Sequence, residues 1–120
     1  LYIENEEHCS PMMQSKIVEA WAQSESYALS IYHTASKMLA GGSIGSESSL
    51  GKIFWSELDH MMHQTALKIL GASAELSNSS EHDAAQWIKG FMFSYGGPIY
   101  AGTNEIQKNI IAERLLGLPK

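Results

Sequence analysis

Both ends of a helix are encoded in the C-terminal stretch Ile99-Tyr100-Ala101-Gly102-Thr103-Asn104-Glu105-Ile106-Gln107, which continues to Leu116-Gly117-Leu118-Pro119-Lys120. Gly102 permits a tight turn, and Thr103 suits the N-cap because its hydroxyl can accept an unpaired N–H of the first turn. Glu105 places negative charge where the helix dipole favours it. Gly117 and Pro119 predict the stop. The stretch therefore predicts a capped helix over 103–116.

Apolar residues recur at helical spacing in three earlier stretches, which predicts helices over 12–40, 47–70 and 81–94. Ser10-Pro11 is typical of a helix entry, and Gly41-Gly42 and Gly71 are typical of helix ends. Ser80 suits the N-cap of the third helix, and residues 72–80 are expected to form a loop. No stretch alternates with period two for long enough to predict a strand. The fold class is therefore all-α, an antiparallel up-and-down four-helix bundle.

The composition excludes several classes of protein. The 120 residues are 44% hydrophobic and 18% charged, which is ordinary for a globular domain. The net charge is −5 and the eight Lys and Arg are scattered, so no basic surface for nucleic acid is expected. The single cysteine excludes an internal disulfide. No apolar run has the length of a membrane span, and the N-terminus has no signal-peptide pattern, so we expect no membrane insertion and no secretion.

The C-terminal motif carries a family resemblance. Tyr-x-Gly-Thr-x-x-Ile-Gln over 100–107, the helix rich in Ile and Ala, and the final Leu-Gly-Leu-Pro together resemble the end of an acyl-CoA dehydrogenase. The order of the helices and Ser-Ser-Leu-Gly-Lys-Ile over 48–53 also resemble that family's C-terminal helical domain. The resemblance implies an N-terminal helical domain and a middle β-domain upstream. Residues 1–120, which begin with Leu1, are therefore expected to be a single helical-bundle domain from the end of a longer chain.

The resemblance implies a chemistry as well. Members of the family bind FAD and oxidise the Cα–Cβ bond of an acyl-CoA thioester, with electron-transfer flavoprotein as the partner. A carboxylate removes the α-proton, and in many members it belongs to a Glu between the Tyr and the Gly of this motif. Ala101 occupies that position here, and alanine cannot accept a proton. No catalytic residue is therefore assigned in this chain, and some relatives carry their Glu on an earlier helix.

Residue roles follow from the resemblance, position by position. Ala101, through its backbone N–H, and Gly102 are implied to bind the substrate, and Thr103, Asn104 and Glu105 are implied to line the diphosphate–adenosine side of the FAD. The family usually has Gln and then a Gly-Gly-x-Gly turn after the second helix. Here those positions are Lys68 and Gly71-Ala72-Ser73-Ala74, so only one glycine remains and we expect no close approach of the backbone to a cofactor at that turn.

Two alternative functions remain open at the level of sequence. The chain could be the non-catalytic subunit of a heteromeric acyl-CoA dehydrogenase, because Ala101 stands at the usual position of the base. It could also be a free-standing metal-binding or interaction bundle, because Glu57 and His60 share a helix face with His63 one turn on. A di-iron site needs a second Glu-x-x-His, which the remaining histidines do not provide, so we expect no metal. We expect the three tryptophans to be core residues or subunit contacts: Trp21, Trp55 and Trp87.

The sequence also predicts assembly. The helix over 47–70 is apolar around more than half of its circumference, through Phe54, Trp55, Leu58, Met61, Met62, Leu67 and Ile69. A four-helix bundle buries one broad stripe per helix, so a homo- or hetero-oligomer is expected, associating through the first two helices. The family resemblance implies a cytoplasmic protein in a bacterium or a mitochondrial matrix protein in a eukaryote.

Overall fold

The structure, a computed structural model, describes residues 9–75 and 82–119, and every regular element in those ranges is helical. The helices are α1 (Pro11–Leu39), α2 (Ser48–Leu70), α3 (His82–Ser94) and α4 (Asn104–Ile110). The all-α prediction with its four helices is confirmed. None of the described helices has the length and hydrophobicity needed to cross a membrane.

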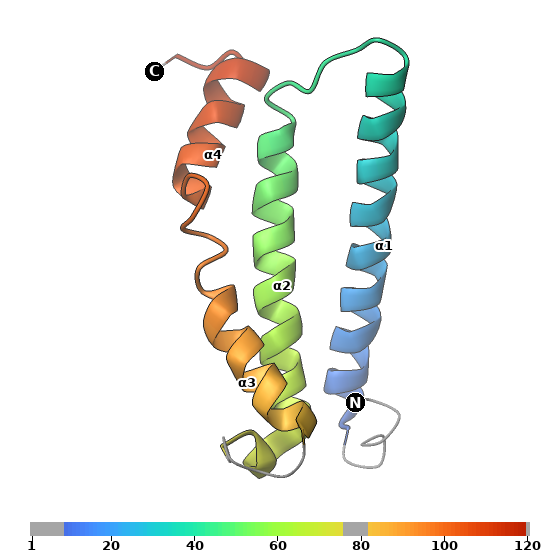
Figure 1. Ribbon diagram of the computed structural model, residues 1–120, viewed down its shortest axis with the longest axis vertical. Coiled ribbons are helices and arrows are strands. Elements are labelled where there is room, and N and C mark those ends of the chain that lie inside the picture. The colour runs from blue at the N-terminus through green and yellow to red at the C-terminus, as the bar shows by residue number, and fades with distance from the viewer. Residues whose placement is uncertain (1–8, 76–81, 120) are drawn as a thin grey trace.

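Helix α2 is the centre of the arrangement (Figure 1). It runs antiparallel to α1 on one side, and on the other side α3 and then α4 follow one another along it in the opposite direction. The 95–103 loop, which joins α3 to α4, therefore lies against the middle of α2. This placement brings the C-terminal motif onto the central helix.

The helix ends have the chemistry that the sequence predicts. Ser10 is the N-cap of α1 and accepts a hydrogen bond from Met13 N–H at 3.3 Å. After α1, Gly41 N–H donates to Met38 O and Gly42 N–H donates to Lys37 O, which is a Schellman motif with Gly41 at φ 84°. Gly71, at φ 56°, ends α2 as predicted. Because these positive φ values favour glycine, the glycines in the sequence determine where α1 and α2 end.

Two elements differ from the predictions. Residues Gly71–Glu75, expected at the start of a loop, form a short 3₁₀ helix, η2. The last helix is not α-helical throughout: after Ile110 it widens into a π-helical turn, η3 (Ile111–Leu115). Leu118 N–H reaches back to Ala112 O at 2.9 Å around Gly117, which satisfies a carbonyl of the widened turn. The predicted N-cap Ser80 lies outside the described residues.

The buried interior is small and largely polar. The buried apolar side chains in the described part of the chain are Cys9, Leu58, Ala66 and Ala84. The buried polar ones are Ser49, Ser56, Thr65, Ser94 and Asn104. Small side chains let neighbouring segments approach α2 closely, as at Gly97, where an added β-carbon would lie 3.2 Å from Ser56 Cβ. The closest approaches to α2 therefore depend on serine and glycine, while large apolar side chains pack around it half-buried.

Helix α1 differs most from its predicted burial. It has no fully buried residue, and along its second half even residues on the α2-facing stripe are open, with Ile31 48% and Met38 50% exposed. Trp21, expected in the core or at a subunit contact, is 65% exposed. The physical reason is that α1 packs mainly on α2, while α3 and α4 lie on the far side of α2.

Candidate functional site

The 95–103 loop is fixed at several points along its length. Ile99 N–H and Tyr100 N–H both donate to Gly96 O, at 2.9 and 3.0 Å. Asn104 N–H donates to Pro98 O at 2.9 Å and closes the end of the loop. The Gln107 side chain reaches back from α4 and donates to Ala101 O at 3.0 Å. The turn at Ala101 is therefore a defined structure and not a loose connection.

The backbone of the turn has an unusual conformation at two consecutive residues. Ala101 has φ 56° and Gly102 has φ 86°. A left-handed backbone costs a residue with a β-carbon about 1–2 kcal/mol, so Ala101 is strained and Gly102 is suited to its place. Both residues are exposed, and within the described residues no acceptor is found for either N–H group. The turn thus presents two backbone donors to the surroundings.

The start of α4 presents acceptors. Thr103 is the N-cap as predicted, with its side chain accepting from Ile106 N–H at 3.3 Å. Hydrogen bonds from Glu105's own backbone and from the Thr103 side chain hold the pKa of the Glu105 carboxyl below its usual value. Glu105 is exposed and is therefore a carboxylate at neutral pH, next to the two donors of the turn.

Asn104 points the other way, into the protein. Its side chain is 4% exposed and lies in a cluster with three α2 residues, which we name the Lys52–Asn104 cluster: Lys52, Ser56, Glu57 and Asn104. Lys52 Nζ donates to Asn104 Oδ1 at 2.7 Å, and Asn104 Nδ2 donates to Ser56 Oγ at 3.1 Å. Of the three residues predicted to line the FAD, Thr103 and Glu105 lie toward solvent, and the Asn104 carboxamide is bonded to α2.

Aromatic side chains flank the loop. The ring of Tyr100 lies 6.0 Å from that of Trp55 on α2 and 6.3 Å from that of Phe93 on α3, centroid to centroid. Tyr100 is 41% and Phe93 is 70% exposed, so the group gives the loop an open apolar border. Trp55 is half-buried against Tyr100.

The turn after α2 lies elsewhere. Lys68 and residues 71–74 are at the end of α2 where α3 begins, away from the α4 end of the molecule (Figure 1). An added β-carbon at Gly71 would meet no atom within 4 Å, so close packing within the chain does not require this glycine. Its φ of 56° does favour glycine. The structure does not bring this segment to the Ala101 turn.

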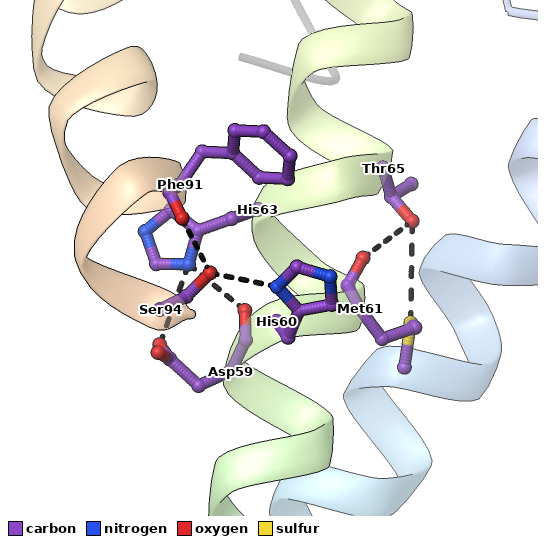
Figure 2. Close-up of polar contacts among 7 residues, drawn as sticks. All are labelled: Asp59, His60, Met61, His63, Thr65, Phe91 and Ser94. Atoms are coloured by element: carbon purple, nitrogen blue, oxygen red, sulfur yellow. Dashed lines mark hydrogen bonds and ion pairs between the residues drawn. The ribbon is translucent and has the colours of Figure 1, made fainter. Parts of the chain in front are cut away.

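The histidines of α2 form hydrogen bonds with other residues of the same chain (Figure 2). His60 Nδ1 lies 2.9 Å from Ser94 Oγ, and because the Ser94 hydroxyl donates to Phe91 O at 2.7 Å, His60 Nδ1 is the donor. His63 Nδ1 donates to Asp59 O at 2.8 Å. Glu57 faces the Lys52–Asn104 cluster and not His60. In the described ranges, no three His, Cys, Asp or Glu side chains come together in a way that suits a metal ion.

Sequence reasoning missed Lys52 and Ser56 as site residues. They are four apart on α2, so they share a helix face, and this spacing is a weak signal of a common partner. The partner, Asn104, lies 48 residues beyond Ser56. Only the packing of α4 on α2 reveals the contact.

Comparison with known proteins supports the family resemblance. Residues 9–116 match the family described as acyl-CoA dehydrogenase, C-terminal domain. The protein named acyl-CoA dehydrogenase IpdE1 of Mycolicibacterium smegmatis is 29% identical over 113 residues, and so is the protein of the same name from Mycobacterium tuberculosis. These matches cover 92% of this chain but 26% and 28% of the two relatives, so the chain spans about a quarter of their length. No solved structure matches significantly. The chain belongs to the acyl-CoA dehydrogenase family, a family of oxidoreductases, and corresponds to its C-terminal domain.

Proposed function

We propose that this domain forms one wall of a flavin-dependent site that oxidises an acyl-CoA thioester between Cα and Cβ. The observation that carries the proposal is the Ala101–Gly102 turn: both residues are exposed, no acceptor is found for their N–H groups within the described residues, and hydrogen bonds on either side hold the turn in place. Ala101 and Gly102 contact the thioester, and the Ala101 N–H donates to its carbonyl oxygen. A preorganised donor of this kind stabilises the negative charge that develops on the oxygen as the α-proton leaves.

Thr103 and Glu105, the two residues proposed to face the cofactor, can accept hydrogen bonds from the hydroxyl groups of a flavin nucleotide. Bound FAD supplies a two-electron acceptor for the substrate hydride. Thr103 and Glu105 present oxygen acceptors, and Glu105 is ionised at neutral pH. Acceptors suit the hydroxyls of ribityl or ribose, whereas a carboxylate repels a diphosphate. In this proposal Thr103 and Glu105 contact the cofactor directly, and Asn104 belongs to the same wall while its carboxamide is bonded to α2.

The base comes from outside this turn. Ala101 retains the N–H of the usual glutamate position but has no group that accepts a proton. We infer that a carboxylate on another part of the full-length protein, or on another subunit, removes the α-proton. Electron-transfer flavoprotein is the proposed acceptor for the reduced flavin.

The test compares three proteins: the full-length protein, the same protein with Ala101→Glu, and the isolated 120 residues. We expect flavin absorbance to copurify with the full-length protein and not with the isolated domain, which lacks the rest of the site. In deuterated water, Ala101→Glu should accelerate exchange of the α-proton of a bound acyl-CoA, because it returns a carboxylate to the turn. A full-length protein without flavin, or a domain that binds flavin or reduces a dye with acyl-CoA, would contradict the proposal.

A second candidate is the non-catalytic subunit of a heteromeric acyl-CoA dehydrogenase. The alanine at the base position favours it. Under this alternative the purified full-length protein is inactive alone and becomes active only when mixed with a second chain that carries the carboxylate. Native mass spectrometry of the protein isolated from its own organism separates the two candidates, because it shows whether a different chain copurifies in fixed stoichiometry. No contact in the described residues favours the free-standing metal-binding bundle.

A further inference from the structure

The orientation of the Asn104 carboxamide is determined by its neighbours. Lys52 has only donors, so the atom it contacts at 2.7 Å must be the carbonyl oxygen Oδ1. The amide nitrogen then faces Ser56 Oγ at 3.1 Å and Glu57 Oε1 at 3.5 Å, both of which can accept. The Ser56 hydroxyl donates its hydrogen bond to Ile53 O at 3.0 Å. A half-buried cation, a buried hydroxyl and a carboxylate thus select a single orientation.

This orientation is transmitted to the loop that carries Ala101. Asn104 N–H donates to Pro98 O, so the residue that is bonded to α2 also closes the loop. Gly97 rests on Ser56, which is 0% exposed, so the same α2 residue supports both sides of the loop. Ala101 lies on the segment between these points, and its carbonyl is bonded by Gln107.

We propose that Asn104 is the positioning residue of the thioester contact, with Lys52 as the group that orients it. The inference rests on the proposed function of the turn and deepens it. Asn104 does not touch the acyl-CoA; it acts through the backbone by fixing where the Ala101 N–H points. A displacement of about 1 Å at a reacting group can lower a rate about a hundredfold, so the direction of this N–H has large consequences.

The geometry distinguishes positioning from simple filling of space. A leucine has the same number and branching of side-chain heavy atoms as asparagine, but it has no polar atom for Lys52 or Ser56. Without the carboxamide, the Lys52 and Ser56 side chains lose their partner, and no directional bond ties the start of α4 to α2. We therefore expect the turn to remain in place on average but to lose its fixed direction.

The experiment uses the full-length protein with Asn104→Leu, with Lys52→Met, and with Asn109→Leu as the matched control, since Asn109 lies on the exposed side of the same helix. The first measurement is hydrogen exchange of residues 96–107 without ligand. The second is the infrared carbonyl band of octanoyl-CoA labelled with carbon-13 at the thioester carbonyl, whose position reports the hydrogen bond to the oxygen. Lys52→Met serves if Asn104→Leu does not fold, because it removes the orienting cation without changing α4.

Exchange of the hydrogen-bonded amides that flank the turn, those of Ile99, Tyr100 and Asn104, should rise about tenfold or more in Asn104→Leu and Lys52→Met, since each removes a hydrogen bond to a charged group. The carbonyl band should move toward its position in free octanoyl-CoA in both variants and stay at the wild-type position in Asn109→Leu. Unchanged exchange overturns the inference whatever the ligand does, and so does faster exchange with an unchanged band. If wild-type protein itself gives no band shift with octanoyl-CoA, the thioester contact of the proposed function fails, and the positioning role fails with it.

Discussion

Ala101 combines a left-handed backbone with a β-carbon. Strain of this kind persists only where the surroundings hold the residue, and here Gln107 bonds the Ala101 carbonyl. The residue therefore carries a cost in stability that glycine would not.

We predict that Ala101→Gly leaves the protein as stable as the wild type or stabilises it by up to about 1.5 kcal/mol. Relief of about 1–2 kcal/mol of backbone strain is opposed by about 0.5–1 kcal/mol from the greater freedom of glycine in the unfolded chain. Ala22→Gly on the exposed side of α1 is the control and should cost about 1 kcal/mol. Urea denaturation measures both, and an equal loss in the two variants would show that residue 101 is not strained.

Glu105 makes stability depend on pH. Its pKa is lowered in the folded protein from the ordinary 4.5, so its ionised form contributes stability that is fully present above pH 4.5. That contribution is lost as the pH falls through the lower, folded-state pKa. We predict that Glu105→Gln is less stable than wild type at neutral pH and that the difference disappears in acid.

Denaturation series from neutral pH to well below 4.5 measure this difference. Glu25→Gln, in the middle of α1 and away from both helix ends, controls for the loss of one negative charge. A Glu105→Gln deficit that persists unchanged in acid would show that the lost contribution is not electrostatic.

At the scale of the elements, the contact between α2 and α3 depends on Gly90. An added β-carbon there would lie 2.2 Å from His63 Nε2. His63 Nδ1 donates a hydrogen bond to Asp59 O at 2.8 Å, and the His63 ring lies 5.5 Å from the Trp87 ring, centroid to centroid. The ring therefore cannot move away without breaking this hydrogen bond. The two helices approach closely because glycine faces the imidazole.

We predict that Gly90→Ala destabilises the protein by about 1–3 kcal/mol through overpacking, although alanine is the better helix former. The control is Gly51→Ala on α2, where the new β-carbon would lie 3.9 Å from Tyr27 Cε2, an ordinary contact, and stability should hold or rise. A double-mutant cycle with His63→Ala tests the cause, because Gly90→Ala should then cease to be harmful. Equal effects in both backgrounds would contradict the proposed clash.

At the scale of the whole molecule, the domain is extended and incompletely buried. Its accessible surface is 8419 Å², whereas a compact monomer of 13.2 kDa exposes about 6,400 Å². Its radius of gyration is 17.6 Å, against about 13.6 Å for a compact domain of this length. Large apolar residues are among those exposed, and a stripe on α1 has five of them at helical spacing: Val18, Trp21, Leu29, Tyr32 and Leu39.

We predict that this surface is covered in the assembled protein, by self-association through α1 and α2 or by a second subunit. Sedimentation velocity of the full-length protein should show an oligomer at about 10 μM. A dissociation constant of that size corresponds to an association free energy of roughly −7 kcal/mol. Leu29→Asp should weaken the oligomer, as should Trp55→Ala if the interface extends to α2. Lys89→Asp, on the exposed side of α3, is the control for the added negative charge. A wild type that remains monomeric at this concentration would exclude self-association.

The sequence by itself determined the helices and their limits. Apolar spacing, the Ser10-Pro11 entry, the glycines after α1 and α2, and the Thr103 cap are local signals, and each acts within a few residues of where it is written. The motif around Ala101 likewise identified the family from adjacent residues. The π-helical turn η3 was not predictable, because the stretch has ordinary helical spacing and the widening depends on how the turn closes around Gly117.

Only the tertiary structure decided which residues of other segments each helix face contacts. Glu57 and His60 share a helix face in the sequence, yet one turns to Asn104 and the other to Ser94. Asn104 stands between two solvent-facing residues in the chain, but it is buried because α4 packs on α2 at Lys52 and Ser56. Periodicity reports which residues share a side of a helix, and it does not report which partner lies there. That partner is set by the docking of segments far apart in the chain, which local sequence does not encode.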